Sequence, residues 1–534
     1  MITPFKRPFM LLLTVAILLF FSNFDLLTWS TFSDDDTHVS QLALSYGWLE
    51  PYYKPEVYQQ LSIVHFTPIV LSIYRAILST FGLNNIAFVI FQLTAITITA
   101  ALAAHLCERI TKQVSAGLIC LVLIFSNVSL LPMLSRFYTA HYLLGAILSL
   151  LILFLIRRAV KNKQLQQSSF LLWLGTFTFL ALLTKEIYIM LVPLLWVVFY
   201  KLQAVKAFIA VTLSLILYFL LRAHILGVSN EGRSGDSFLS AILALNLDTW
   251  ADFIYWYLTT KWLIIISVCI AFIRAPRVMF EYTLLASLFA APALAAPHAF
   301  QNPQLHGDRL FFMFDIAIII SSVLAIYSRP IAQKPLSIIL LCTLLGLIPL
   351  QRYFLHSFSL TQTNTANYTI NQALLNQTRR TDTIVFTPLN YYQGEFMNIY
   401  RLLNNPWLTI IQNCQRALQL TTPTHKKTKV SLLAFDETGT VISRNDVMER
   451  CQESHGVATV KTPPTFNNGL LSWSFSVPDG HTGGILLIDR GIAVGAGEFQ
   501  QRLVRPKPDE RYQIYTRKNN MWWFSDINFI NVSG

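Results

Sequence analysis

Residues 10–38 read MLLLTVAILLFFSNFDLLTWSTFSDDDTH and join a long apolar run to three adjacent carboxylates, Asp34, Asp35 and Asp36. About twenty apolar residues are enough for a helix to cross a bilayer. The run is longer than the apolar core of a signal peptide and lacks a small-residue cleavage site, so we expect an uncleaved membrane helix at 8–27. Adjacent carboxylates repel one another, and such a cluster persists where water, a cation or a reaction uses it.

The composition of the whole chain is typical of a protein with many membrane helices. The 534 residues are 54% hydrophobic and 13% charged, whereas soluble domains carry about 25% charged residues. Barrel strands would alternate in segments of roughly ten residues, and the apolar runs here are continuous over about twenty. The net charge of +12 is spread over short loops without a dense basic patch, so nucleic acid is not an expected partner.

Apolar runs continue as far as residue 350 and predict a polytopic α-helical membrane protein with about eleven transmembrane helices. The predicted spans are 8–27, 86–106, 115–133, 139–156, 169–183, 187–200, 205–226, 257–273, 279–297, 310–327 and 336–350.

Lysine and arginine residues are concentrated in alternate connections between these spans. The pairs Lys6/Arg7 and Arg157/Arg158 are examples, and the intervening connections are poorer in positive charge. By the positive-inside rule, the N-terminus lies in the cytoplasm, and the loop 25–85 and everything after residue 350 lie outside. We expect a multi-pass protein of a bacterial inner (plasma) membrane.

The second half of the outer loop, HFTPIVLSIYRAILSTFGL at residues 65–83, has helical periodicity and a single charge, Arg75. This pattern predicts an amphipathic helix lying on the membrane surface. If the segment crossed the membrane instead, every later basic loop would move to the outside, against the positive-inside rule.

The chain changes character after residue 359. Its apolar runs shorten to strand length, as in LSWSFSV and RYQIYTR, and turn sequences such as DETG and PDGHTGG separate them. We therefore expect two domains, a membrane domain at 1–359 and an extracytoplasmic, mixed β-rich soluble domain at 360–534. Cys414 and Cys451 lie in the second and could pair in an oxidising compartment. No cysteine spacing indicates a structural zinc site.

The outer loop resembles the first outer loop of the GT-C glycosyltransferases, which are polytopic membrane enzymes. In those proteins an acidic pair precedes a Gly-Trp segment with a proline, and a Lys- or His-x-x-Pro sequence enters a surface helix. The corresponding residues here are Asp35-Asp36, Gly47-Trp48, Pro51 and His65-Phe66-Thr67-Pro68. The likeness is closest to bacterial lipid A aminoarabinose transferases and protein O-mannosyltransferases, although this loop is about one helical turn shorter between the acidic pair and Gly-Trp.

Two further features suit that superfamily. Lys185-Glu186 opens an apolar helix that continues to a Pro-Leu-Leu sequence, as in its mannosyltransferase-like members; an interfacial ion pair is the alternative interpretation. Arg136, Arg233 and Arg309 stand alone in outer loops, where the positive-inside rule disfavours them. Each could form a local salt bridge, but together they suit an anionic ligand such as a phosphate.

The resemblance implies transfer of a sugar from a polyprenyl-phosphate-linked donor to an extracytoplasmic glycan, lipid or protein acceptor, with inversion. A carboxylate within reach of the acceptor can serve as general base; we expect Asp35 in this role, with Asp34 as the second candidate. No cofactor is expected, although clustered aspartates also suit a divalent metal ion. The donor phosphate and substrate would contact Asp36, His65, Arg136, Lys185, Glu186 and Arg309.

Two other classes of function remain as alternatives. A transporter or lipid flippase with a periplasmic binding domain would also be polytopic, but such proteins tend to show paired halves, and no internal repeat is evident. A non-enzymatic envelope scaffold would carry its binding function in residues 360–534.

Overall fold

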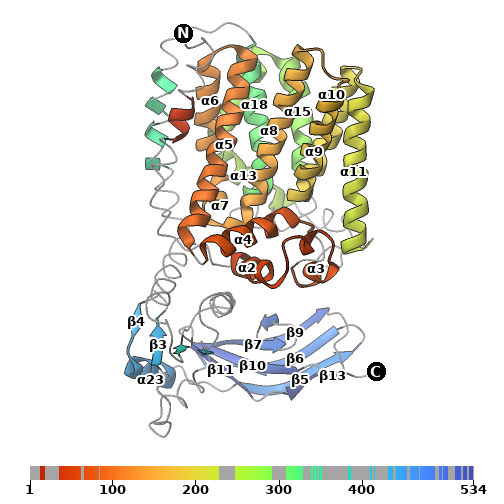
Figure 1. Cartoon of the computed structure of the whole chain (residues 1–534). Coiled ribbons are helices and arrows are strands. Elements are labelled where there is room, and N and C mark those ends of the chain that lie inside the picture. Colours follow the sequence, from red (N-terminus) through yellow and green to blue (C-terminus); the bar gives the residue numbers. More distant parts are fainter. Residues whose placement is uncertain are drawn as a thin grey trace. The chain divides into compact units, whose positions relative to one another are not determined.

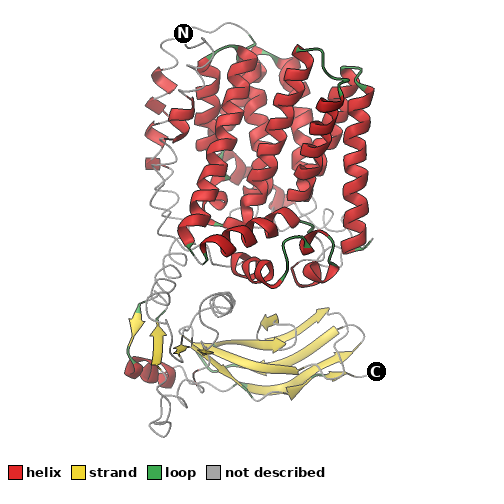
Figure 2. Cartoon of the chain, viewed as in Figure 1, coloured by secondary structure: helices red, strands yellow, loops and turns green. Residues whose placement is uncertain are grey.

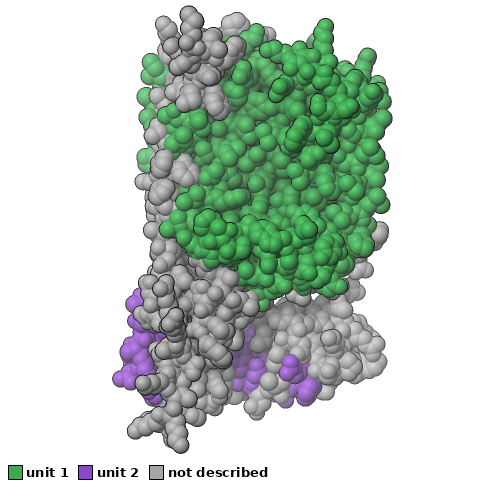
Figure 3. All heavy atoms as spheres, viewed as in Figure 1, with its two compact units in different colours: residues 1–364 green, residues 365–534 purple. Residues whose placement is uncertain are grey.

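The chain forms two compact units, residues 1–364 and 365–534 (Figure 3). The predicted boundary after residue 359 lies close to this division. The computed structural model describes residues 12–17, 35–61, 65–82, 84–227, 247–291, 308–328, 338–340, 342–343, 345–347, 349–350, 383–386, 409–411, 414, 431–436, 440–453, 458–467, 470–487, 492–495, 497–502, 511–518, 521–525 and 528–532.

The described residues of unit 1 form helices joined by short loops, without strands (Figures 1 and 2). Its α-helices are α2 (Asp35–Ser45), α3 (Pro55–Leu61), α4 (Pro68–Phe81), α5 (Asn85–Thr111), α6 (Val114–Phe125), α7 (Leu130–Ser135), α8 (Ala140–Lys161), α9 (Ser168–Thr184), α10 (Leu191–Lys201), α11 (Val205–Leu226), α13 (Leu247–Thr260), α14 (Trp262–Arg274), α15 (Pro276–Ser287) and α18 (Asp308–Ile326). Short 3-10 helices are η2 (Glu50–Tyr52), η3 (Phe137–Thr139), η4 (Glu186–Met190) and η5 (Leu288–Ala290).

Within the described residues, four helical segments are long and apolar enough to cross a membrane. They are Asn85–Thr111, Phe137–Lys161, Val205–Leu226 and Arg309–Ile326. Helices α13 and α14 pass the same test as a pair but are bent by 86°. A helical architecture with apolar, membrane-length helices is therefore confirmed, whereas the count of about eleven spans is not.

Three predicted spans contain a break in the helix. In the span 115–133, α6 ends at Phe125 and α7 begins at Leu130. The span 187–200 begins within η4 and becomes an α-helix only at Leu191. The span 257–273 is divided between α13 and α14. Hydropathy measures composition, so it cannot reveal these changes of backbone direction.

The predicted amphipathic helix forms as α4, and α2, α3 and α4 lie crosswise over one end of the helix bundle (Figure 1). Pro68 occupies the first position of α4, where its missing N–H is not needed. Arg75 of α4 donates hydrogen bonds to the carbonyls of Ala43 at 2.9 Å, Leu44 at 3.0 Å and Tyr46. A cation at the carboxyl end of a helix can bond its last carbonyls. Arg75 of α4 does this at the end of α2 and thereby links the two helices.

Unit 2 is rich in strands, as predicted (Figure 2). One sheet has the order β2-β1-β3-β4, a second β11-β10-β7-β8 with β12 beside β10, and a third β13-β5-β6-β9. The strands are β1 (Thr383–Phe386), β2 (Thr409–Ile411), β3 (Ser431–Phe435), β4 (Val441–Ile442), β5 (Thr459–Asn467), β6 (Leu470–Ser476), β7 (Thr482–Leu487), β8 (Ile492–Gly495), β9 (Gly497–Arg502), β10 (Arg511–Lys518), β11 (Met521–Phe524), β12 (Asn528–Phe529) and β13 (Asn531–Val532).

The core of unit 2 lies between the second and third sheets. Trp473 and Phe475 of β6 pack against Ile485 of β7 and against Tyr512 and Ile514 of β10 in one buried cluster. Alternate residues of a strand point to the same face, so β6 and β10 each present one apolar face to this core. The five side chains therefore hold two sheets face to face.

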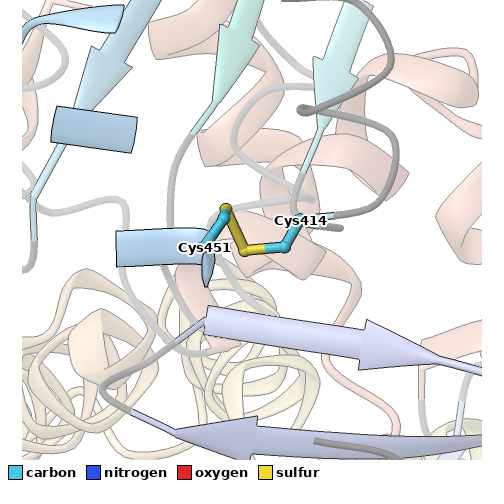
Figure 4. The surroundings of a disulfide bond; sticks show 2 residues. All are labelled: Cys414 and Cys451. Atoms are coloured by element: carbon cyan, nitrogen blue, oxygen red, sulfur yellow. A yellow bond between two sulfur atoms is a disulfide. The ribbon is translucent and has the colours of Figure 1, made fainter. Parts of the chain in front are cut away.

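A disulfide joins Cys414 to Cys451, which lies in the helix α23 (Arg444–Glu453) (Figure 4). The two cysteines are 37 residues apart in the chain, and both are fully buried. Cys107, Cys120, Cys269 and Cys342 are free thiols. The pairing that the sequence left open is thus present, and disulfides of this kind persist in oxidising compartments.

Replacing Cys414 and Cys451 by serine should lower the free energy of unfolding of unit 2 by about 3–4 kcal/mol, because the cross-link closes a long loop in the unfolded chain. Thermal unfolding of the purified full-length protein measures the loss, and Cys269→Ser, which removes a free thiol, is the matched control. Alkylation in SDS followed by intact mass measurement should modify four cysteines before reduction and six after it. Six modified cysteines before reduction would contradict the pairing.

Candidate functional site

The acidic triplet lies at the start of α2. Asp34 falls outside the described residues, and of Asp35 only the backbone, as the first residue of α2, is described. The carboxylate of Asp36 is buried, with 1% of the residue exposed. It accepts hydrogen bonds from the Tyr74 hydroxyl and from the backbone N–H groups of Phe137 at 3.1 Å and Tyr138 at 2.5 Å. Asp36 therefore caps the η3–α8 segment, because carboxylates are favourable where helical N–H groups lack partners.

Two of the lone arginines meet at a tyrosine that the sequence analysis did not single out. Arg136 donates to the hydroxyl of Tyr138 at 3.0 Å, and Arg309 donates to the same oxygen. Their guanidinium carbons lie 5.9 Å and 5.3 Å from the centre of the Tyr138 ring. Arg309 is the second residue of α18 and Arg136 follows α7, so two distant segments bring both cations to one acceptor. Arg233 lies outside the described residues.

A buried glutamine holds the turn that carries Arg136. Gln92 of α5 donates through Nε2 to the carbonyl of Met133, to the carbonyl of Arg136 at 2.8 Å and to Oγ1 of Thr139 at 3.2 Å. Only 2% of Gln92 is exposed, and burying its amide is favourable only with such partners. The backbone before Tyr138 and the side chain of Thr139 after it are thereby fixed to α5.

His65, Lys185 and Glu186, which were also predicted to contact the substrate, form a second group. Oε2 of Glu186 lies 3.4 Å from Nδ1 of His65 and 3.6 Å from Nζ of Lys185. Oε1 accepts a hydrogen bond from the backbone N–H of Phe66. The structure thus joins the His-x-x-Pro entry of α4 to the Lys-Glu pair between α9 and α10.

The Glu186 carboxylate is held in its ionised form. Burial by itself raises the pKa of this group, but the positive charge of Lys185 and the hydrogen bond and charge of His65 outweigh that effect, and the pKa is lowered overall. A group with a lowered pKa contributes stability above its unfolded-state pKa and loses that contribution only as the pH falls through its folded-state pKa. Glu186 is therefore an anion at neutral pH and suits charge pairing better than proton donation.

His141, which the sequence analysis did not predict, lies between the two groups. It belongs to the first turn of α8, and its ring centroid is 4.4 Å from that of Tyr142 and 6.4 Å from that of Tyr138. It interacts electrostatically with Lys185 and Glu186, and its buried Nε2 has no hydrogen-bond partner among the described residues. We call the following residues the polar cluster: Asp36, His65, Arg136, Tyr138, His141, Lys185, Glu186 and Arg309.

Close packing of η4 on α8 sets the position of Glu186. The Tyr188 hydroxyl donates to the carbonyl of Tyr142, and the Tyr188 ring fills the space that a side chain at Gly145 would need. Glycine is required here for a close approach rather than for its backbone angles.

A third group lies within the bundle and was missed by the sequence analysis. Lys261 donates to Oδ2 of Asp315 at 2.6 Å, and neither side chain is exposed. Lys261 also donates to Oγ of Ser129 at 2.8 Å. The sequence around Lys261 gives no local indication that its partner is Asp315, which is 54 residues away in α18.

An apolar cavity of about 320 Å³ runs along α5, α8, α10, α15 and α18. Its walls include Leu150 and Leu153 of α8 and Met313, Ala317 and Leu324 of α18, and no residue of the polar cluster lines it. Cavities of this size and lining take apolar ligands or the apolar part of an amphipathic one.

No group of three or more His, Cys, Asp or Glu side chains among the described residues is placed to hold a metal ion. Asp34 and the side chain of Asp35 are outside that part of the chain. A divalent metal at the acidic triplet therefore stays a prediction.

Comparison with known proteins gives no match: no family model, no curated protein and no solved structure is similar to the chain.

Changing Gly145 to alanine should push η4 away from α8 and destabilise unit 1 by about 1–3 kcal/mol, the usual cost of overpacking. Gly175→Ala in α9 is the matched control, because the added methyl would meet its nearest atom, Oγ of Ser214, at an ordinary 3.5 Å. Helix propensity alone would stabilise either variant by about 1 kcal/mol. Thermal unfolding in detergent should thus separate the two, and equal melting temperatures would contradict the packing role of Gly145.

Proposed function

We propose that unit 1 is a membrane glycosyltransferase that moves a sugar from a polyprenyl-phosphate donor to an extracytoplasmic glycan, lipid or protein acceptor with inversion. The observation that carries this proposal is the meeting of Arg136 and Arg309 on one acceptor beside the first turn of α8. The GT-C-like residues of the outer loop add the reaction type. The Cys414–Cys451 disulfide supports an extracytoplasmic side for unit 2, and the distribution of lysine and arginine among the connections supports a cytoplasmic N-terminus in the inner membrane.

The arginine pair supports binding of the donor phosphate. Both guanidiniums donate to the neutral hydroxyl of Tyr138, and an anionic phosphate oxygen is a stronger acceptor than a phenol. Arginine binds phosphate oxygens in a bidentate manner.

The apolar cavity supports a lipid-linked donor. Ser149, where the cavity begins on α8, follows His141 by eight residues, which is roughly 12 Å along the helix axis. A donor with its phosphate at the polar cluster would thus have an apolar space further along the same helix for part of its chain.

Chain connectivity supports Asp35 as the general base. Adjacent Cα atoms are separated by about 3.8 Å, and the next residue, Asp36, is hydrogen-bonded to the backbone of Tyr138. Asp35 consequently starts α2 close to the Arg136–Tyr138 segment, where the two arginines meet. Asp36, although grouped with the substrate-binding residues in the sequence analysis, is better suited to fixing this segment than to contacting substrate.

The proposed reaction is a direct displacement. The acceptor hydroxyl or amine gives its proton to Asp35 as its oxygen or nitrogen bonds to the anomeric carbon. The bond from that carbon to the phosphate oxygen breaks, and the electron pair remains on the phosphate, whose charge Arg136 and Arg309 stabilise. Lys185 is a further cation of the site, His65 lies beside it, and Glu186 balances the charge of Lys185.

One observation favours the transporter or flippase as a second candidate. Transporters use discontinuous helices and ionisable residues within the bundle, and α13 and α14 form a bent pair next to the buried Lys261 and Asp315.

Asp35→Asn should lower sugar transfer by about 10²–10⁴-fold, the usual contribution of a general base. Arg309→Gln should lower it by about 10²–10³-fold, as the loss of one transition-state donor does. The assay is transfer of radiolabelled sugar from polyprenyl phosphate by the full-length protein in detergent, with an envelope extract as acceptor source.

Lys201→Gln is the matched control, because it neutralises an exposed cation that pairs with Glu281 at 3.5 Å. It should leave transfer unchanged. Full activity of Asp35→Asn would show that the base is assigned wrongly. Since detergent abolishes any gradient, absence of transfer by the unaltered protein over a panel of donors would favour transport.

A further inference from the structure

A closed hydrogen-bond network surrounds the buried carboxylate of Asp315. Oδ1 accepts from the Tyr257 hydroxyl at 2.9 Å. Oδ2 accepts from Asn127 at 2.9 Å, from Ser129 at 2.7 Å and from Lys261 at 2.6 Å. A buried carboxylate is stable only when paired and hydrogen-bonded, and both oxygens of Asp315 meet that condition.

Lys261 lies at the bend between α13 and α14 and is enclosed by aromatic rings. Its Nζ is 4.8 Å from the centre of the Tyr257 ring, 5.4 Å from that of Trp256 and 5.9 Å from that of Phe311. Rings at these distances attract a desolvated ammonium group. The ion pair is therefore a fixed joint between the bend and α18.

This joint connects the two segments that deliver the arginine pair. Asp315 follows Arg309 on α18 by six residues, roughly 9 Å along the axis. Asn127 and Ser129 directly precede α7, and Arg136 directly follows it. The network thus fixes α18 against the α6–α7 turn within a short distance of both guanidiniums.

We propose that Lys261 and Asp315 are positioning residues that hold Arg309 and Arg136 in register for a lipid phosphate. The proposal rests on the phosphate-binding role of the arginine pair proposed above, and it does not depend on sugar transfer. The ligand class is a phosphate monoester of a long-chain alcohol, the product that the transfer would leave behind.

The test is a double-mutant cycle between Asp315→Asn and Arg309→Gln, read as the affinity of the full-length protein in detergent for dodecyl phosphate. In the unaltered background Asp315→Asn should weaken binding at least about tenfold, because α18 is no longer held by the ion pair. In the Arg309→Gln background it should change binding less than about twofold. Effects of tenfold and twofold in the two backgrounds differ about fivefold, which corresponds to a coupling of about 1 kcal/mol.

Ser322→Ala is the matched control. It removes a hydrogen bond between α14 and α18, to Ser267 at 3.1 Å, at a point further from Arg309 along α18. It should leave the affinity for dodecyl phosphate unchanged even where it lowers the melting temperature. Ser129→Ala removes a single partner of Asp315 and replaces Asp315→Asn in the cycle where the latter does not fold.

Three outcomes would overturn the proposal. The first is an unchanged affinity after Asp315→Asn or Ser129→Ala, and the second is an equal loss in both backgrounds, which indicates general destabilisation. The third is an unaltered protein that binds dodecyl phosphate no better than Arg309→Gln, which removes the phosphate site itself. Coupled binding without any sugar transfer would instead uphold the positioning role and refute the proposed enzyme.

Discussion

The hydrogen bonds that Asp36 accepts from the backbone of Phe137 and Tyr138 are the constraint on which the arrangement of the polar cluster depends. A buried carboxylate is costly without donors, and the first N–H groups of a helical segment are costly without acceptors. The Asp36 carboxylate gains donors and the N–H groups gain an acceptor in the same hydrogen bonds, so α2 is fixed against the start of α8. This contact sets Asp35 near Tyr138, and Tyr138 in turn receives both arginines.

Several polar groups enter the bundle at breaks in the apolar helices. The turn between α6 and α7 supplies Asn127 and Ser129 to Asp315. The η4 segment supplies Glu186, and the bend after α13 supplies Lys261. A continuous helix satisfies its own backbone and presents only side chains, whereas each break places a polar side chain at a junction of several helices. The interruptions of the predicted spans and the formation of the site therefore have one structural origin.

The sequence allowed prediction of the helical class, the crosswise helix α4, the strand-rich C-terminal part and most members of the polar cluster. These features follow from local patterns: apolar run length, helical periodicity, and charges placed where the positive-inside rule disfavours them. Tyr138, His141 and Asp315 were missed, because each depends on at least one partner that is distant in the chain, such as Arg309 for Tyr138. Tyr138 has no local charge signal, and the meaning of Asp315 depends on Lys261, which is 54 residues away. The count of about eleven spans is not confirmed within the described residues, because hydropathy does not detect bends such as the one between α13 and α14.

The buried ion pair also bears on the choice between an enzyme and a transporter. For α14 to move past α18 in alternating access, Lys261 and Asp315 would have to separate, and an uncompensated buried charge costs about 3–5 kcal/mol. The aromatic rings around Lys261 and the full set of donors on Asp315 would be lost at the same time. An ion pair that is this costly to separate suits a rigid support better than a moving part of a transport cycle. Rigid supports are what a displacement reaction needs, since its acceleration depends on holding the base, the anomeric carbon and the phosphate in line.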